Sequence, residues 1–560
     1  MGTHNRKGTR QGIRVSGPHV SPERRQLALS AMSSSADDVT TQRTRHLVRS
    51  SAVVALGTGL SRLTGFLRVG VMAYAIGATA LAEAYNLANN TPNLLYDLVL
   101  GGILSATLVP VVVAHTGRDD NRGIDALATV ISVVLVVATV IGIALAPIII
   151  RLYNLSSSSA DAATQAKIAV PLLMMFAPQI LFYGLTSLGT ALLNARRSFA
   201  VPAFAPVLNN VVVICLFLAL PHFANDKALT FDQVSHDTGL LLLLGFGTTA
   251  GLLAMTLVLW PAMRSAGIRL RWNFDLRDPA VREVGRLSGW TFGYVVSNLI
   301  AYGIIQTLAN GVDGVSIYAY AWLFFQLPYG LWTVSVMTSY TPELSALHAA
   351  ADTSGLRRRF SSGLRLVLVL ALPATIGMIL LAGPIVRLVL EHGEFTQANA
   401  DTTANTLIAF LYGLPAFSLF LFAMRGFYAQ RDTRFPFYIN AAETVLALTI
   451  AFSVVDRFGV VGLGASGSVA YSVFAVIALA LLHRRIGRFL DAATITTIAK
   501  LVLSSAVMGF IVWAFLHFTN LSDLSTLVCA ALLGICVYAA SLFVLRVDEA
   551  RITADRLLRR

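Results

Sequence analysis

Cysteine is scarce in this sequence, with three residues among 560, and each of the three lies in an apolar stretch. Cys215, Cys529 and Cys536 therefore predict neither a disulfide framework nor the ligand spacing of a metal site. The ten histidines are scattered and form no HExxH motif. We expect no metal site in this protein.

The signatures of common enzymes are missing as well. The sequence contains no Walker lysine, no GxSxG elbow and no aspartate-rich motif for a diphosphate-bound metal. An ATP-driven pump needs a nucleotide-binding domain, and no polar stretch here is long enough to fold into one. We therefore expect no catalytic residues and no cofactor, with transport coupled to the membrane potential or to a monovalent ion as a possibility.

Charged residues make up only 13% of the chain, whereas 56% of it is hydrophobic. Repeated apolar stretches of about 20 residues predict a polytopic helical membrane protein. About 14 such segments can be counted, including separate ones centred near residues 446 and 470. The fold class that follows is an all-α polytopic membrane protein: two six-helix lobes in parallel repeat plus two C-terminal helices.

The basic residues are distributed unevenly between alternate loops. Of the 42 Lys and Arg residues, 35 fall in one set of loops and tails, two lie in the first span, and five lie in the other set. Those five are Arg151, Lys167, Lys227, Arg387 and Arg457. This pattern predicts cytoplasmic termini, because basic loops stay on the cytoplasmic side of a cell membrane. The net charge of +13 thus indicates topology and contact with anionic lipids, and we expect no nucleic acid as a partner.

The chain divides at its most polar stretches. Residues 1–50 read as a disordered basic cytoplasmic tail, because they are polar and carry no apolar signal-peptide core. The further predicted divisions are an N-lobe at 51–263, a cytoplasmic linker at 264–286, a C-lobe at 287–482, two last helices at 483–546 and a cytoplasmic tail at 547–560.

An internal repeat supports the boundary between the lobes. The pairs Ala195/Ala429, Arg197/Arg431 and Pro202/Pro436 are each separated by 234 positions. Both loops are short and basic, and a proline opens the following helix, where its missing N–H costs nothing. An even number of helices in each half makes the repeats parallel, and such repeats form a binding cleft near the midplane of the membrane.

Two arginines inside the first apolar segment organise the functional hypothesis. On a helix, Arg62 and Arg68 bound a polar wedge about 120° wide around Gly65, and three leucines (Leu60, Leu63, Leu67) occupy the opposite side. An arginine near the bilayer centre costs roughly 2.5–3.5 kcal/mol, so the wedge is expected to face a lined cavity. Guanidinium groups in such a cavity favour phosphate or carboxylate. The alternative is that both arginines extend to the lipid headgroups.

Two acidic residues also lie within predicted spans. Glu83 precedes the second apolar segment, and it either pairs with Arg68 in a structural role, or sets the charge of the cavity or gates its outer side. Glu443, seven residues beyond Pro436, is interpreted as a polar contact between helices rather than as a substrate ligand.

Several motifs together resemble the MurJ/MviN family. They are SRLTGFLR at residues 61–68, GA at 77–78, EAY at 83–85, PNLL at 92–95, LNA at 193–195, FAVPA at 199–203, APVLN at 205–209, EHGEFT at 391–396, GFYA at 426–429 and DT at 432–433, followed by Pro436. The resemblance extends over about residues 52–545.

The resemblance implies the fourteen-helix fold of flippases that move lipid II, the undecaprenyl-diphosphate-linked peptidoglycan precursor, to the outer leaflet of the bacterial inner membrane. It implies that the first twelve helices enclose a cationic cavity and that the last two form a groove for the lipid tail. Arg62 and Arg68 match functionally important arginines of the family and would bind the diphosphate. Glu83 stands where the family usually carries aspartate. The implied partners are the lipid-linked precursor, membrane lipids and possibly cell-wall synthesis proteins.

The sequence departs from the family pattern at two places. The family often carries basic residues directly after PNLL, where this chain has Tyr96 and Asp97. A later arginine of the family is replaced by Trp322. The cavity of this chain is therefore expected to carry less positive charge than the cavity that the family pattern implies.

Three other functions remain open from the sequence. They are a flippase for another polyprenyl-linked glycan, a MATE-like exporter, and a non-transporting membrane scaffold for cell-wall enzymes. The arginine wedge argues against a cationic drug, because like charges repel strongly at low dielectric. A scaffold has no need of arginines inside a span.

Overall fold

The computed structural model describes residues 56–96, 122–157, 159–196, 198–224, 229–430, 432–519 and 522–547. Within these ranges the secondary structure is helical, and no strand is present. The predicted tail at 1–50 lies outside the described residues, as do Asp97 and all of the predicted tail at 547–560 except Val547.

The N-terminal half consists of a helix over residues 56–76 and eight further α-helices in the described ranges. Their bounds are α2 (Ala80–Tyr96), α4 (Arg122–Tyr153), α5 (Ser159–Phe176), α6 (Gln179–Ala195), α7 (Ala200–Phe223), α8 (Phe231–His236), α9 (Thr238–Leu257) and α10 (Leu259–Ser265). A short 3₁₀ turn, η3 (Asn154–Ser156), follows α4.

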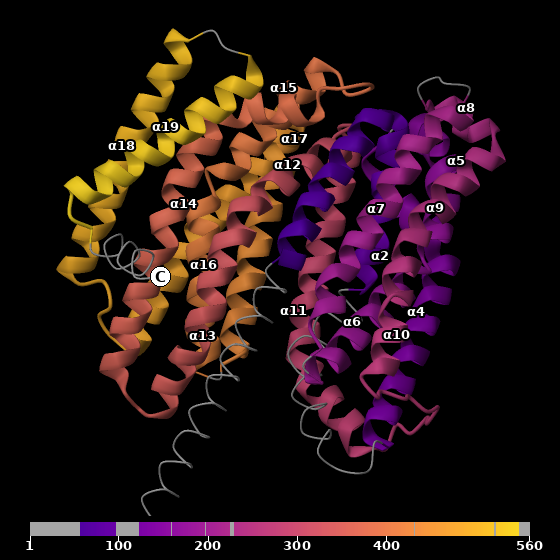
Figure 1. Cartoon of the computed structure of the whole chain (residues 1–560), viewed down its shortest axis with the longest axis horizontal. Coiled ribbons are helices and arrows are strands. Elements are labelled where there is room, and N and C mark those ends of the chain that lie inside the picture. Colours follow the sequence, from indigo (N-terminus) through magenta and orange to yellow (C-terminus); the bar gives the residue numbers. More distant parts are fainter. Residues whose placement is uncertain are drawn as a thin grey trace, which may run out of the picture.

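The C-terminal half begins at α11 (Pro279–Asn310) and continues through helices of very different length. Their bounds are α12 (Val315–Pro328), the π-helical turn η4 (Tyr329–Thr333), α13 (Val334–Ala349), α14 (Thr353–Leu390), α15 (Gln397–Leu411), α16 (Leu414–Ala429), α17 (Arg434–Ile486), α18 (Ala492–Phe518) and α19 (Asp523–Val544). Figure 1 shows the two halves side by side, with the sequence colours separating them.

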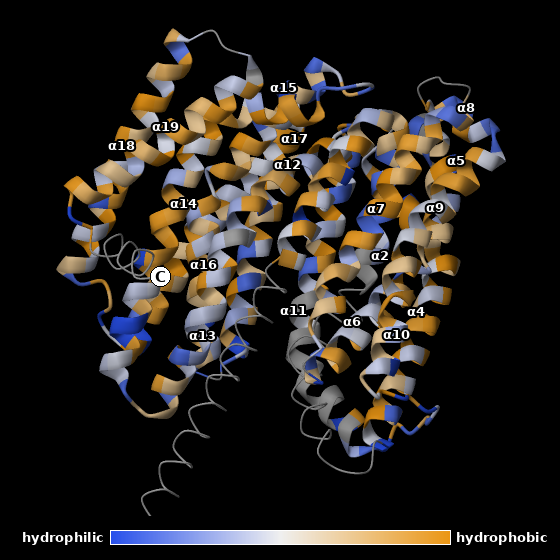
Figure 2. Ribbon diagram, viewed as in Figure 1, coloured by the Kyte–Doolittle hydropathy of each residue, from blue (hydrophilic) through white to orange (hydrophobic). Residues whose placement is uncertain are grey.

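Several of these helices can cross a membrane. In the described part of the chain, eight are long and apolar enough to do so, or nine if the bent pair α15–α16 is one span. Their outward faces are apolar, as on α4, where Val136, Val140 and Ile148 are about half exposed. Figure 2 shows this apolar surface along the helices and blue, hydrophilic residues at the two ends. The prediction of an all-helical membrane protein is confirmed at this level.

The 53 helical residues of α17 are two arms that meet at Gly459. This glycine has φ +56° and ψ −142°, which are not helical values. A Cβ built on Gly462 would lie 3.0 Å from a methyl of Val454, although eight residues of straight helix separate two positions by about 12 Å. The chain therefore turns back at Gly459, and the segments predicted near residues 446 and 470 pack as a hairpin.

The two loops of the predicted repeat have the same local geometry. Helix α6 ends at Ala195 and α16 ends at Ala429, and the capping residues Arg196 and Gln430 have φ/ψ of −88°/10° and −87°/12°. Pro202 is the third residue of α7, as Pro436 is of α17. Arg197 and Arg431 lie outside the described residues. The matching caps support the repeat, which the sequence indicates by only three identical residues.

The predicted linker at 264–286 contacts α4 in the part that lies between α10 and α11. The backbone N–H of Arg271 donates to the Asp125 carboxylate at 3.0 Å, and that of Asn273 donates to the Thr129 hydroxyl at 3.0 Å. Both acceptors belong to the first turns of α4. The linker therefore lies against the N-terminal half, and its last residues from Pro279 onward are already part of α11.

Candidate functional site: a polar cavity and an interhelical latch

The helix over residues 56–76 separates an apolar face from a polar one, as predicted. Leu60, Leu63 and Leu67 are 37%, 58% and 52% exposed. On the other face, the Asn210 amide of α7 donates to the Ser61 carbonyl and to the Thr64 hydroxyl, both at 3.0 Å. The leucines can therefore meet lipid while the polar face is turned toward protein.

Arg68 lines a cavity of about 200 Å³. Among the described residues that line it, Arg68 is the one that carries a charge. Its neighbours are mainly amide and hydroxyl side chains, namely Asn86, Asn89, Asn90, Gln179, Tyr183, Asn209, Thr248 and Gln326. The amide nitrogen of Asn90, a hydrogen-bond donor, is buried and has no partner in the described part of the chain. One guanidinium and several amide donors suit an anion, because charge-assisted N–H···O bonds are the strong ones.

Arg62 has different surroundings from Arg68. Its guanidinium lies against the backbone of Gly330, where a Cβ would come within 2.7 Å of the Nη1 atom. Gly330 belongs to η4, a π-helical turn of the kind that is frequent at functional sites. Arg62 is absent from the residues that line the Arg68 cavity. The structure thus places one predicted site residue in the polar cavity and the other against the C-terminal half, and the diphosphate role of both stays a prediction.

Glu83 binds the N-terminus of a helix in the other half of the chain. Its carboxylate, 3% exposed, accepts the backbone N–H of Val315 at 2.7 Å and that of Ser316 at 2.9 Å. Gly314, the N-cap of α12, has no side chain to cap these groups, so Glu83 supplies the cap. The positive end of the helix dipole adds to the attraction. No ion pair joins Glu83 to Arg68 in the described residues, so the contact to α12 replaces that interpretation.

Three further hydrogen bonds join the segment around Glu83 to the C-terminal half. Asn86 Nδ2 donates to Ser316 Oγ at 2.9 Å, Tyr320 Oη donates to the Gly77 carbonyl at 3.2 Å, and the Glu394 N–H donates to the Tyr74 carbonyl at 3.2 Å. We call the residues that carry these contacts, 74–86, 315–320 and 393–394, the latch. The latch lies at the end of the bundle that carries α8 and α15, opposite α10 and α13 (Figure 1). It holds the two halves together at that end, which agrees with Glu83 acting as a gate.

Gly77 is expected to be intolerant of substitution because the latch closes on it. Its φ is +61°, and a Cβ there would collide with the carbonyl oxygen of Glu394. We expect Gly77→Ala to lower transport at least about tenfold, since both backbone strain and the collision oppose closure. Gly267→Ala is the matched control, because Gly267 also has a positive φ (+74°) but no atom within 4 Å of the added Cβ. Complementation of a depleted strain measures both, and equal effects would contradict the latch.

A family comparison agrees with the resemblance read from the motifs. The model of the family described as lipid II flippase MurJ matches residues 72–532 of this chain. This chain belongs to the lipid II flippase MurJ family. A probable lipid II flippase MurJ of Vibrio cholerae serotype O1 is 28% identical over 487 residues, which are 84% of this chain and 89% of that protein. The lipid II flippase MurJ of Burkholderia cenocepacia is 29% identical over 432 residues, 75% of this chain and 80% of its own.

Solved structures show the same fold. A structure described as lipid II flippase MurJ in an inward closed conformation superposes with a TM-score of 0.71 at 23% identity, covering 88% of this chain and 99% of its own. An inward-facing multidrug resistance MATE family transporter of the MOP superfamily gives a TM-score of 0.61 at 14% identity, and the match covers 76% of this chain and 94% of that transporter. Membership of the flippase family makes this chain a multi-pass membrane transporter of the bacterial inner membrane.

Sequence reasoning missed most of the cavity around Arg68. Its amide residues come from four separate segments, and nothing in the local spacing of Asn86, Gln179 or Gln326 distinguishes them from ordinary helix contacts. The unusual density of asparagine at 86, 89 and 90 was the one available signal. Trp322, noted as a departure from the family, lines the same cavity.

Proposed function

We propose that this chain moves an undecaprenyl-diphosphate-linked peptidoglycan precursor, lipid II, from the inner to the outer leaflet by alternating access. The observation that carries the proposal is the Arg68 cavity, where a guanidinium and a set of amide side chains line a site inside the bundle. A diphosphate needs several N–H donors in a partly dehydrated site, and a planar guanidinium matches its oxygens. Family membership supports the identity of the lipid.

A second cavity has the character expected for the lipid tail. It has a volume of about 760 Å³ and lies between η4, α14 and α16 on one side and α18 and α19 on the other. Its lining is almost wholly apolar, with Leu370, Met378, Met508, Ile535 and Leu542 among the residues. A polyprenyl chain can enter such surroundings from the bilayer without loss, because lipid chains and apolar side chains are equally apolar. We propose that the last two helices hold the tail while the headgroup crosses between the halves.

The finer architecture remains part of the proposal. It comprises fourteen spans, two lobes of six helices related by a parallel repeat, and rocking of the lobes about a site near the midplane. The latch at one end of the bundle supports such a motion, because opening it would expose the cavity on that side. Negative charge leaves an inside-negative cell downhill, by about 2.3 kcal/mol per charge and 100 mV. We therefore propose coupling to the membrane potential, with coupling to a monovalent ion as the alternative.

We propose that both termini are cytoplasmic. The orientation of the chain in the membrane follows from the uneven distribution of basic residues between alternate loops. His236, next to the exposed end of α8, is then external, and Ser354, in the first turn of α14, is cytoplasmic. In a cysteine-free background, His236→Cys should react with a membrane-impermeant thiol reagent in intact cells, whereas Ser354→Cys should react only after permeabilisation. Labelling of both in intact cells would contradict this topology.

Depletion of the protein tests the proposed substrate. Lipid II should then accumulate on the cytoplasmic leaflet, and other polyprenyl-linked glycans should be distributed as before. Accumulation of a different glycan carrier would assign the chain to that lipid, and normal distribution of all of them would favour the scaffold. Interaction with cell-wall synthesis proteins is proposed on family grounds alone.

A further inference from the structure

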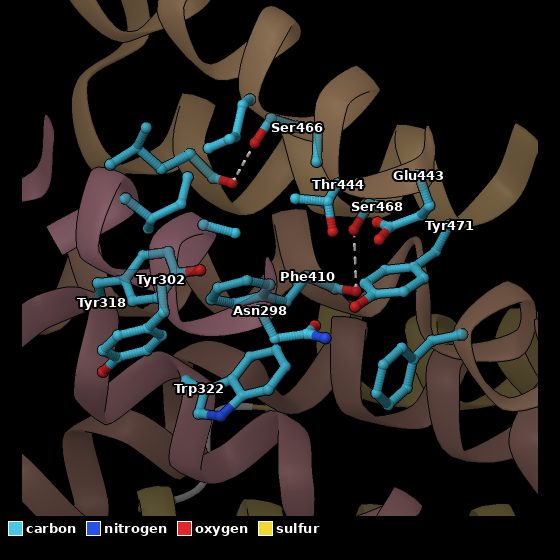
Figure 3. Close-up of a pocket in the computed structure, with 18 of the residues that line it drawn as sticks. Asn298, Tyr302, Tyr318, Trp322, Phe410, Glu443, Thr444, Ser466, Ser468 and Tyr471 are labelled. Atoms are coloured by element: carbon cyan, nitrogen blue, oxygen red, sulfur yellow. Dashed lines mark hydrogen bonds between the residues drawn. The ribbon is translucent and has the colours of Figure 1, made fainter. Parts of the chain in front are cut away.

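A larger cavity adjoins the Arg68 cavity on the side of the C-terminal half. Its volume is about 490 Å³, and it is lined by residues of α11, α12, α15, α16 and both arms of α17. Tyr302, Tyr318 and Trp322 line both cavities, so the two spaces are neighbours separated by these three rings. Figure 3 shows the polar and aromatic side chains around the larger space.

Glu443 gives this cavity an acidic group, whereas its neighbour carries a basic one. It is the one acidic residue among the described residues that line the cavity, and it is 3% exposed. No lysine, arginine or histidine is found among the described residues that line this cavity. A buried carboxylate without a counter-charge is costly, and a ligand cation would remove that cost.

Aromatic rings form most of the remaining wall. Tyr302, Tyr318, Trp322, Phe325, Phe410, Phe417 and Tyr471 all line the cavity. The rings pack against one another, with Trp322 stacked on Phe325 at 5.1 Å and Phe417 edge-on to Tyr471 at 4.7 Å between centroids. Such packing fixes the ring faces in place. Aromatic faces together with one carboxylate are the surroundings that organic ammonium groups prefer.

Two hydroxyl groups also favour a cation over an anion. Ser466 donates its proton to the Leu463 carbonyl at 2.7 Å, and Ser468 donates to the Ala409 carbonyl at 2.6 Å. Because each proton is used, only the oxygen lone pairs remain for a ligand. In Figure 3 the oxygens of Glu443, Thr444 and Ser468 lie close together and face the rings across the cavity. At Ser466 and Ser468 the cavity therefore presents acceptors beside the Glu443 carboxylate.

The size and lining of the cavity favour an organic cation over a bare metal ion. A metal ion needs several oxygens at about 2.0–2.6 Å around one point, and no cluster of three or more metal-binding side chains is found in the described residues. A space of about 490 Å³ walled by rings instead fits a substituted ammonium group with its carbon atoms.

We propose that the Glu443 cavity binds an organic ammonium group through its carboxylate and the faces of Trp322 and Tyr471. The group is either a free organic cation or the amino group on the peptide of the transported precursor. In the second case the inference rests on the proposed function, and the precursor spans both cavities with its diphosphate at Arg68 and its ammonium at Glu443.

Binding of a free cation tests the site without any transport. The purified full chain in lipid nanodiscs is titrated with tetramethylammonium or butylammonium, and tryptophan fluorescence reports occupancy near Trp322. We expect Glu443→Gln, which keeps the shape and removes the charge, to weaken binding at least about tenfold. Trp322→Leu should weaken it several-fold without altering charge, and because this variant lacks the reporting indole its binding is measured by isothermal titration calorimetry. A thermal melt of each variant shows that it is folded.

The matched control is Glu343→Gln, because Glu343 is half exposed and paired with Arg359 at the end of α13. It should bind the ammonium probes as the unchanged chain does. Three results would contradict the proposal: no binding of either probe, equal binding by the Glu443→Gln variant, or binding of Na⁺ to the exclusion of both organic cations.

Transport of a modified precursor separates the two sources of the ammonium group. If the precursor's own amino group occupies the cavity, acetylating it should slow flipping by the unchanged chain and leave flipping by Glu443→Gln unaltered. Equal rates for both precursors in the unchanged chain assign the cavity to a free cation. Failure of the chain to flip either precursor would overturn the proposed function but would leave the binding titration as an independent test of the cavity.

Discussion

Arg68→Ala is expected to abolish transport while the protein remains in the membrane at near its normal level. The substitution removes the one charge that the described residues bring to the polar cavity, and hydrogen bonds to charged groups contribute about 1.5–3 kcal/mol each, or roughly 10- to 150-fold in affinity. Removing a charge from a span does not hinder insertion. Arg68→Lys should restore only part of the activity, since ammonium keeps the charge but lacks the planar fork. Complementation of a depleted strain, with immunoblots, measures both.

Arg62→Ala is expected to behave similarly if Arg62 joins the site when the halves move, because its guanidinium already lies against Gly330 of the C-terminal half. Arg457→Ala is the control for both, since Arg457 is exposed and makes a cation–π interaction with the neighbouring ring of Phe458. Normal growth of the double variant Arg62→Ala with Arg68→Ala would end the binding-site hypothesis and favour arginines that merely extend to headgroups.

A disulfide across the latch is expected to stop transport completely. Asn86 and Ser316 donate and accept a hydrogen bond at 2.9 Å, although 230 positions separate them in the chain. Asn86→Cys with Ser316→Cys, in a chain whose three native cysteines are replaced, should bridge on oxidation and hold that end closed. Growth should fail under oxidising conditions and return with a reductant to the level of the single Asn86→Cys and Ser316→Cys variants, because the latch must open in each cycle of alternating access.

A disulfide within one half is the matched control. Thr186 of α6 and Thr256 of α9 have hydroxyls 2.9 Å apart, and both belong to the N-terminal half. Thr186→Cys with Thr256→Cys should form a bridge of similar length without linking the two halves, and activity should persist. Activity of the oxidised Asn86/Ser316 variant, with the bridge confirmed by mass spectrometry, would exclude the motion proposed here.

The sequence predicted best what the membrane itself imposes. Lipid accepts only apolar side chains and hydrogen-bonded backbone, so helices and the exposed face with Leu63 and Leu67 could be placed from periodicity alone. The hairpin at Gly459 also followed from the length of its apolar arms. These features depend on local sequence and a slab of fixed thickness, which is why they needed no knowledge of neighbouring helices.

Contacts between distant helices could not be predicted in this way. Glu83 and Val315 are separated by 232 positions, so nothing in the spacing around Glu83 indicates that its carboxylate caps α12. Glu443 was interpreted as a helix contact, because the rings around its cavity come from α11, α12, α15, α16 and the second arm of α17. The break between α15 and α16, bent by 45°, has no clear sequence marker other than Gly413 and Pro415. Packing between distant helices determines the Glu83 cap, the surroundings of Glu443 and the bend between α15 and α16.

Flipping of lipid II by the purified chain in vesicles tests the central claim most directly. Fluorescent lipid II is reconstituted with the protein, and its exposure to a membrane-impermeant reagent reports transfer between leaflets over time. The account predicts transfer by the unchanged chain and by Arg457→Ala, and loss of transfer in Arg68→Ala. Transfer at the normal rate by Arg68→Ala, or none by the unchanged chain, would contradict it.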